Sequence, residues 1–243
     1  MSAMIRAFEL KAFCITVTLF LAGCASQPTE VSVEPAGISA EDEPVSWWYV
    51  RFRLHWPGGE DTLWYPDLLL ADRVLRPILE KEREAIVLWR FHRRAARDEA
   101  GRRFSFIFRA TPATAERVNA RIAGNPWIAR LHRRGILERV DFDDPGRPTR
   151  LHIGDTSDPA WSTEMQVAWP HFIMGVSQLW LELIRELEKQ GKWPVKPLAR
   201  YAAIENAMNE HWHSEGGHAL LHHLSAIFGY RELLVTRREV MRF

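Results

Sequence analysis

The sequence has 243 residues, of which 47% are apolar, and its formal net charge is +1. This composition excludes a chain that is disordered throughout, because such chains combine few apolar residues with a high net charge. The chain has only two cysteines, Cys14 and Cys24, so a fold held together by several disulfides is excluded as well.

The start of the chain has the layout of a secretory signal peptide. Arg6 and Lys11 precede an apolar run over residues 12–22. This run is shorter than the ~20 residues of a membrane-spanning helix. The run leads into Leu21-Ala22-Gly23-Cys24. These four residues resemble the bacterial lipobox, in which the cysteine is acylated and becomes the new N-terminus. The resemblance implies a bacterial lipoprotein with Cys24 as its lipidation site, whereas an ordinary secretory signal is the alternative.

The lipobox resemblance also divides the chain and locates the protein. Residues 1–23 are then the signal peptide. Residues 24–46 are the lipidated N-terminus and a flexible tether, because they are small, acidic and interrupted by prolines. By the same resemblance, Ala25 after the cysteine implies the outer membrane, facing the periplasm, with the inner membrane as the alternative. The mature body has no thiolate nucleophile, which excludes papain-like chemistry.

The folded part is predicted to begin with an α+β unit over residues 47–143. Alternating apolar and polar side chains predict strands over residues 47–56, 85–94, 102–110 and 137–142. Helical spacing predicts helices over residues 67–83, kinked by Pro77, and 113–134, broken at 124–126. The order strand-helix-strand-strand-helix-strand is the ferredoxin-like split βαββαβ arrangement.

A C-terminal helical region is predicted to follow this unit. Residues 144–161 are rich in turn-forming residues and are predicted to be a loop or linker. Within residues 162–243, apolar periodicity predicts helices over residues 172–188, 198–211 and 218–228. A break is expected at residues 214–217, where two glycines follow each other.

Basic residues are concentrated in the predicted sheet unit. Residues 51–150 hold 21 basic and 14 acidic residues, and 20 of the basic residues are arginine. The strand pattern places a set of them, with aromatic neighbours, on the sheet face that the helices leave open: Tyr49, Arg51, Arg53, Arg90, His92, Arg103 and Arg109. Arginine forms forked bonds to carboxylates and phosphates, so this face suits an anionic lipid, a glycan or an acidic envelope protein. Nucleic acid is not expected outside the inner membrane, and burial of this face by later helices is the alternative.

Half of the ten histidines lie within residues 210–223. His218 and His222 are four residues apart, so both imidazoles would share one face of a helix. With Glu215 or His211 as a third ligand, they would suit zinc or another divalent transition metal. The pattern resembles half of the zincin motif, but position 219 is alanine where zincins have a glutamate base. Surface histidines without a metal are the alternative.

No nucleophile elbow, phosphate loop or dinucleotide fingerprint occurs in the sequence, so catalytic residues stay unknown and the chain is predicted not to be an enzyme. The leading hypothesis is a membrane-anchored envelope lipoprotein that acts as a binding or scaffolding module. One alternative is a metal-dependent, hydrolase-like periplasmic enzyme that uses the histidines of residues 211–223. Another is a binder of anionic lipid or glycan through the arginine-rich sheet face.

Overall fold

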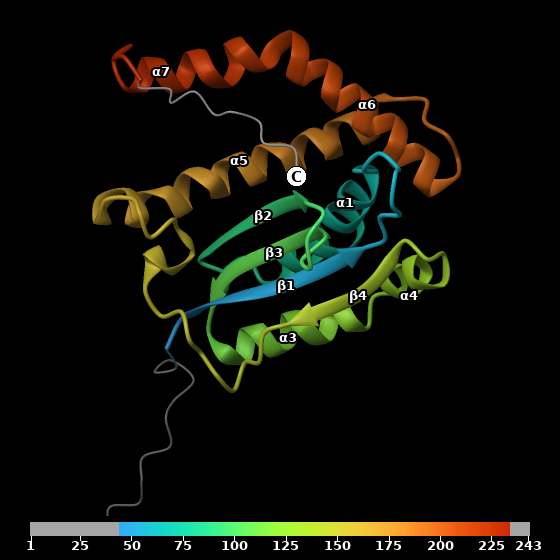
Figure 1. Ribbon diagram of the computed structural model, residues 1–243, viewed down its shortest axis with the longest axis horizontal. Coiled ribbons are helices and arrows are strands. Elements are labelled where there is room, and N and C mark those ends of the chain that lie inside the picture. The colour runs from blue at the N-terminus through green and yellow to red at the C-terminus, as the bar shows by residue number, and fades with distance from the viewer. Residues whose placement is uncertain (1–43, 234–243) are drawn as a thin grey trace, which may run out of the picture. The chain divides into compact units, whose positions relative to one another are not determined.

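A computed structural model describes residues 44–233, which form a mixed α+β structure (Figure 1). Cys24 and nearly all of the predicted tether lie outside the described residues. The four strands are β1 (Ser46–Leu54), β2 (Leu88–Ala95), β3 (Arg102–Ala110) and β4 (Leu137–Phe142). They form one sheet in the order β2-β3-β1-β4, in which every pair of neighbours is antiparallel. The α+β class follows from the sequence pattern as predicted.

The alternation within the strands builds an aromatic layer on one face of the sheet. On β1, Trp48, Val50 and Phe52 lie opposite the three phenylalanines of β3, Phe108, Phe106 and Phe104. Trp89 and Phe91 of β2 continue this face, and all of these side chains are buried. The strand predicted over residues 85–94 begins only at Leu88, and Val87 before it is 58% exposed.

The first helical stretch covers this aromatic face and contains a local irregularity before Pro77. It consists of α1 (Tyr65–Leu70), the π-helical turn η1 (Ala71–Leu75) and α2 (Arg76–Lys81). Proline has no N–H to bond the carbonyl of Arg73 four residues earlier. That carbonyl instead accepts a hydrogen bond from the Asn125 side chain at 3.4 Å. The helix is therefore irregular just before the proline at which a kink was predicted, and a neighbouring loop satisfies the freed carbonyl.

The second helical stretch of the sheet unit is split as predicted. Helix α3 (Pro112–Ala123) begins after Thr111, whose side chain accepts a hydrogen bond from the Thr114 N–H. Helix α4 (Pro126–Arg133) follows, capped by Asn125. Both helices contribute buried apolar side chains to the main core beneath the sheet: Ala115, Val118, Ile122, Ile128 and Leu131.

The first of the C-terminal helices packs against the edge of the sheet that β2 forms. A short 3-10 turn, η2 (Ile153–Thr156), precedes α5 (Thr163–Gln190), which runs beside β2 in Figure 1. The N–H of Phe91 points out of the sheet and donates to Ser177 Oγ of α5 at 3.1 Å. Leu181 and Ile184 of α5 join the same core as the aromatic layer. Helix α5 thus protects an edge strand that would otherwise expose unpaired backbone groups.

The last helices form one continuous stretch rather than two. Helix α6 (Pro197–Gly216) passes into the π-helical turn η3 (Gly217–His222) and then into α7 (His223–Ile227). The predicted break at residues 214–217 is wrong, because Gly216 and Gly217 both have helical dihedral angles. A side chain at Gly216 would place its Cβ 2.9 Å from the Trp212 ring, so this glycine makes room for tryptophan within a helix. Among the described residues, no helix is both long and apolar enough to cross a membrane.

Two buried carboxylates of the first helical stretch connect it to the other layers. Asp67 is fully buried and pairs with Arg93 of β2, at 2.7 Å, and with Arg102 of β3. Asp72 accepts a hydrogen bond from the Tyr201 hydroxyl of α6. Burial and this bond to Asp72 raise the pKa of Tyr201, so it stays a neutral donor. Charges inside the core are therefore matched to partners on other elements.

Replacing Ser177 with alanine removes the acceptor of the Phe91 N–H. We expect the free energy of unfolding, measured by urea denaturation, to fall by about 1–3 kcal/mol, the usual cost of leaving a buried donor unpaired. The matched control is Ser214→Ala, because the Ser214 hydroxyl also bonds the carbonyl four residues earlier but accepts no strand N–H. An effect at Ser177 as small as that at Ser214 would contradict the edge-protecting role of α5.

Candidate functional site

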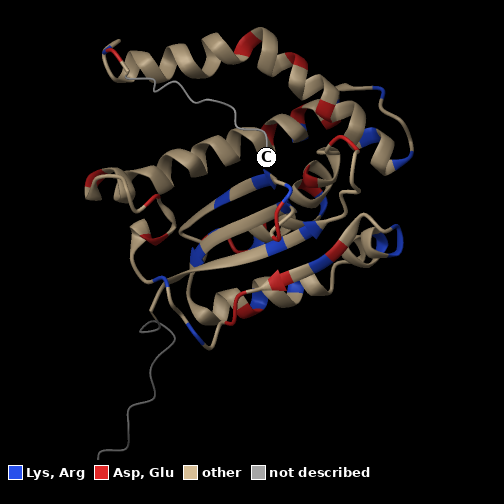
Figure 2. Ribbon diagram, viewed as in Figure 1, with Lys and Arg blue, Asp and Glu red and all other residues tan. Residues whose placement is uncertain are grey.

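The sheet face opposite the core carries four arginines in one line, one from each strand. Arg94 of β2 lies directly opposite Arg103 of β3. Arg103 lies opposite Arg53 of β1, and Arg53 opposite Arg139 of β4. Figure 2 shows how often basic residues recur along the strands. Residues directly opposite each other in a sheet are roughly 5 Å apart at Cβ, so like charges there repel. These four residues are called the arginine row.

The members of the arginine row differ in their acidic partners. Three of them have a carboxylate nearby: Arg94 with Asp98, Arg53 with Glu138 and Arg139 with Asp141. The Arg103 side chain makes only one hydrogen bond with the described residues, to the Ala100 carbonyl at 3.4 Å. Partial burial and the positive charges of Arg51 and Arg94 lower the pKa of Arg103. The middle of the row is therefore the place where positive charge is least compensated.

Next to the row, Tyr49 and Arg51 belong to a cluster in which two arginines share one carboxylate. The guanidinium groups of Arg51 and Arg150 lie 4.6 and 4.5 Å from the centroid of the Tyr49 ring. Both also pair with Asp143, at 2.8 and 2.7 Å. Cation–π contacts and ion pairs thus hold these side chains together. The cluster borders the row and fixes the orientation of Arg51.

The other end of this face is covered, as the alternative interpretation of the sequence expected. Arg90 is only 9% exposed, because η2 and the first turns of α5 pack over it. Its guanidinium donates to the Thr156 carbonyl at 3.0 Å and lies 4.6 Å from the Trp169 ring centroid. A small second core lies beside it, formed by Trp47, Leu88 and Ile107 with Ile153 and Met174. Arg90 is therefore not accessible to a ligand, although the strand pattern in the sequence predicted it to be a binding residue.

His92 lies between the covered and the open parts of the face. Desolvation and the neighbouring charges of Arg90, Arg94 and Arg103 lower the pKa of His92. Its imidazole is therefore neutral at pH 7 and adds no charge to the row. All seven predicted binding residues share this face in the structure, but Arg109 donates to the Leu151 carbonyl beside the covered end.

Two members of the arginine row, Arg94 and Arg139, were missing from the predicted set. The alternation of β2 did place Arg94 on the open face, so the sequence held a usable signal for it. Arg139 joins the row only through the pairing of β4 with β1, and this pairing shifts register between Arg53 and Leu54. The sequence of β4 alone does not reveal that shift.

The predicted metal ligands fall into two separate groups. His211 Nδ1 lies 3.0 Å from Glu215 Oε1, one turn away on α6. The rings of His218, His222 and His223 lie with centroids 5.1–5.3 Å apart on η3 and α7, and only those of His218 and His222 are stacked. Within residues 44–233, no group of three or more His, Cys, Asp or Glu side chains is arranged to hold a metal ion.

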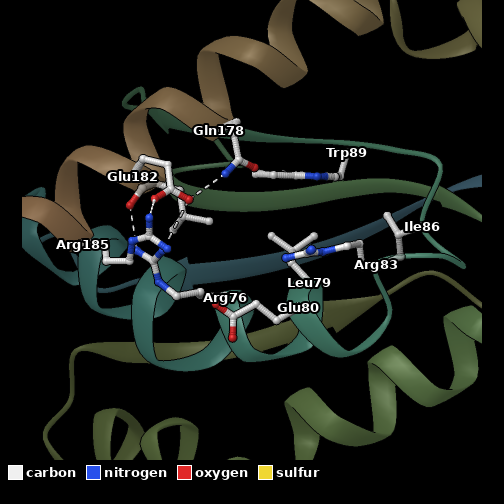
Figure 3. Close-up of a pocket in the computed structure, with 10 residues that line it drawn as sticks. Arg76, Leu79, Glu80, Arg83, Ile86, Trp89, Gln178, Glu182 and Arg185 are labelled. Carbon is white, nitrogen blue, oxygen red and sulfur yellow. Dashed lines mark hydrogen bonds and ion pairs between the residues drawn. The ribbon is translucent and has the colours of Figure 1, made fainter.

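A small pocket of about 150 Å³ lies between α2 and α5 (Figure 3). Gln178, Glu182 and Arg185 of α5 gather there opposite Arg76. Glu182 is 3.9 Å from Arg76, pairs with Arg185 and accepts a hydrogen bond from Gln178 at 2.8 Å. Because these polar groups satisfy one another, the pocket is a weaker candidate site than the open sheet face.

No protein-family model matches the sequence. Comparisons with curated proteins and with solved structures also found no significant match. The function is therefore inferred from the arrangement of the residues themselves.

Arg102 and Arg103 are neighbours in β3 but face opposite sides of the sheet, so neutralising them should affect stability differently. We expect Arg103→Gln to leave the free energy of unfolding unchanged or to raise it by up to about 1 kcal/mol, since it removes repulsion from opposite arginines. Arg102→Gln removes a buried partner of Asp67 and should cost about 3–5 kcal/mol. Urea denaturation measures both, and similar losses in the two variants would contradict a repulsive row.

Proposed function

We propose that this chain is a membrane-anchored bacterial envelope lipoprotein, acylated at Cys24, whose α+β body is a binding module for an anionic ligand. The Leu21-Ala22-Gly23-Cys24 sequence supports the anchor, and Ala25 supports the periplasmic side of the outer membrane. The observation that carries the binding function is the arginine row, with Arg103 flanked by two arginines and forming no ion pair with the described residues.

We also assign the sheet unit to the ferredoxin-like split βαββαβ class. The strand order β2-β3-β1-β4 supports this assignment, as do the helices between β1 and β2 and between β3 and β4. In this arrangement the helices cover one sheet face and leave the other free. The free face is the one that carries the arginine row, so the fold itself presents the row to a ligand.

An anion is the ligand that the electrostatics of the row favour. A phosphate or carboxylate above Arg103 would lie near guanidinium groups from β1, β2 and β3. It would replace like-charge repulsion with charge-assisted hydrogen bonds, which are stronger than neutral ones. Asp98, Glu138 and Asp141 limit the net charge of the face, so moderate and salt-sensitive affinity is expected.

An anionic lipid surface is the ligand that the anchor brings closest. The predicted tether ahead of β1, residues 25–45, would have a root-mean-square reach of roughly 25 Å by random-coil scaling. Such a tether keeps the module at a high effective concentration of headgroups. The arginine row would then bind phosphate-bearing headgroups of the membrane that holds the lipid anchor.

Cys24→Ala should give a protein that carries no lipid and is released from the membrane fraction, because the thiol is the proposed acylation site. Mass spectrometry of the mature protein and fractionation of cell envelopes measure the two effects. Cys14→Ala is the control, since this cysteine lies in the predicted signal peptide and should not change either result. Normal membrane retention of Cys24→Ala would contradict the anchor.

Binding to vesicles that contain phosphatidylglycerol should exceed binding to purely phosphatidylcholine vesicles and should weaken as salt is added. The Debye length falls from ~10 Å at ~0.1 M to ~3 Å at ~1 M ionic strength, which screens such contacts. Replacing both Arg103 and Arg139 with glutamine should weaken binding about 25-fold, because each arginine near an anionic surface contributes about 1 kcal/mol. Co-sedimentation with vesicles measures both effects.

The charge-matched control is Arg133→Gln with Arg134→Gln, since both arginines are exposed at the end of α4 and away from the open face. This control should retain binding. Equal losses in the two double variants would indicate a nonspecific charge effect and contradict the arginine row as the site. A soluble polyanion that binds where the vesicles do not would identify an envelope glycan instead of the lipid surface.

A further inference from the structure

The C-terminal helices enclose an apolar groove of about 320 Å³ that is separate from the arginine row. One wall is formed by α5, and the other by α6 and η3, which lie above α5 in Figure 1. Apolar side chains line both walls, among them Val176, Leu179, Trp180, Met208, Trp212 and Leu220. Several of them reach solvent at the rim, and Trp212 is 56% exposed. Exposed apolar surface of this kind marks a place where another apolar group binds.

Five polar side chains also line this apolar groove: Arg93, Glu205, Asn209, His211 and Glu215. His211 and Glu215 pair with each other at 3.0 Å. Arg93 Nε donates to Asp67 at 2.7 Å, and Nη2 donates to the Trp64 carbonyl at 3.2 Å. Its contact with Glu205 is long, at 3.5 Å, and Nη1 makes no hydrogen bond with the described residues. The guanidinium lies 5.2 Å from the centroid of the Trp180 ring, which places it against the apolar wall.

The charges around the Arg93 guanidinium favour the binding of an anion. Arg102 lies next to Arg93 and is buried, and its Nε and Nη1 atoms have no hydrogen-bond partner within residues 44–233. Burial raises the pKa of Glu205, and this carboxylate lies farther from Arg93 than Asp67 does, at 3.5 Å against 2.7 Å. Asp67 is thus the main negative charge facing two buried or half-buried arginines. Ligand sites typically combine an apolar cavity of this size with a few convergent polar groups.

We propose that the groove binds a fatty acid, with the acyl chain between α5 and α6–η3 and the carboxylate on Arg93. The apolar walls match the acyl chain, and the free Nη1 of Arg93 matches the carboxylate. An alcohol of the same chain length would fill the groove equally well but would lack the charged head. The carboxylate therefore accounts for the specificity of the site, and the chain accounts for most of the affinity.

The test titrates dodecanoate and dodecanol into the full chain by isothermal titration calorimetry. Dodecanoate should bind with one ligand per chain, and dodecanol at least about tenfold more weakly, since it lacks the charge-assisted bond to Arg93. Arg93→Gln should reduce the affinity for dodecanoate to that for dodecanol. No saturable binding of dodecanoate, or equal affinity for the two ligands, would overturn the proposal.

A second variant keeps the test valid if Arg93→Gln fails to fold, because Arg93 also supports Asp67. Leu179→Gln places a polar side chain in the groove wall and should weaken both ligands about tenfold, as expected for a lost apolar contact. The matched control is Leu151→Gln, because Leu151 is 45% exposed, close to the 40% of Leu179, and lies outside the groove. Unchanged binding in Leu179→Gln would overturn the proposal.

Two further measurements separate this site from other occupants and from the arginine row. Dodecanoate binding should be unaffected by Arg103→Gln, so failure of the vesicle experiment and failure of this one are distinguishable. If a second copy of the chain fills the groove instead, sedimentation equilibrium should show a dimer that Leu179→Gln dissociates and that dodecanoate does not. That result would overturn the fatty-acid assignment.

Discussion

The arrangement of the layers depends on the ion pairs that the buried carboxylate of Asp67 makes. A charge without access to water is tolerated only when it is paired, and Asp67 obtains its partners from two strands, through Arg93 and Arg102. One helical turn further on, Asp72 binds the hydroxyl of Tyr201 in the C-terminal region. The first helical stretch is thereby bonded to the sheet on one side and to α6 on the other.

The same requirement explains why arginines occur on both faces of the sheet. Arginine is doubled in β2, at residues 93–94, and in β3, at residues 102–103. Because side chains alternate along a strand, one member of each pair points into the core and pairs with Asp67. The other member points to the open face and joins the arginine row. The buried ion pairs and the exposed positive charge are therefore two consequences of one pattern.

The C-terminal helices decide which parts of these features remain accessible. Helix α5 covers the edge of β2 and, together with η2, the end of the open face that holds Arg90. The remainder of that face, with the arginine row, stays open. The helices also create the apolar groove, and Arg93 lies where the buried ion pairs meet this groove. Both candidate sites thus take their arginines from the sheet unit, but only the apolar groove is enclosed by later segments.

The sequence by itself determined the α+β class, the limits of β3 and β4 and the irregularity at Pro77. These features depend on neighbouring residues, through side-chain alternation and the missing N–H of proline. The lipidation of Cys24 stays a prediction, because that residue lies outside the described part of the chain. Only the tertiary structure decided the placement of Arg139 in the row, the coverage of Arg90 and the helical continuation through Gly216. The first two depend on how segments distant in sequence pair or pack. The third depends on glycine, which can adopt either a turn or a helical conformation.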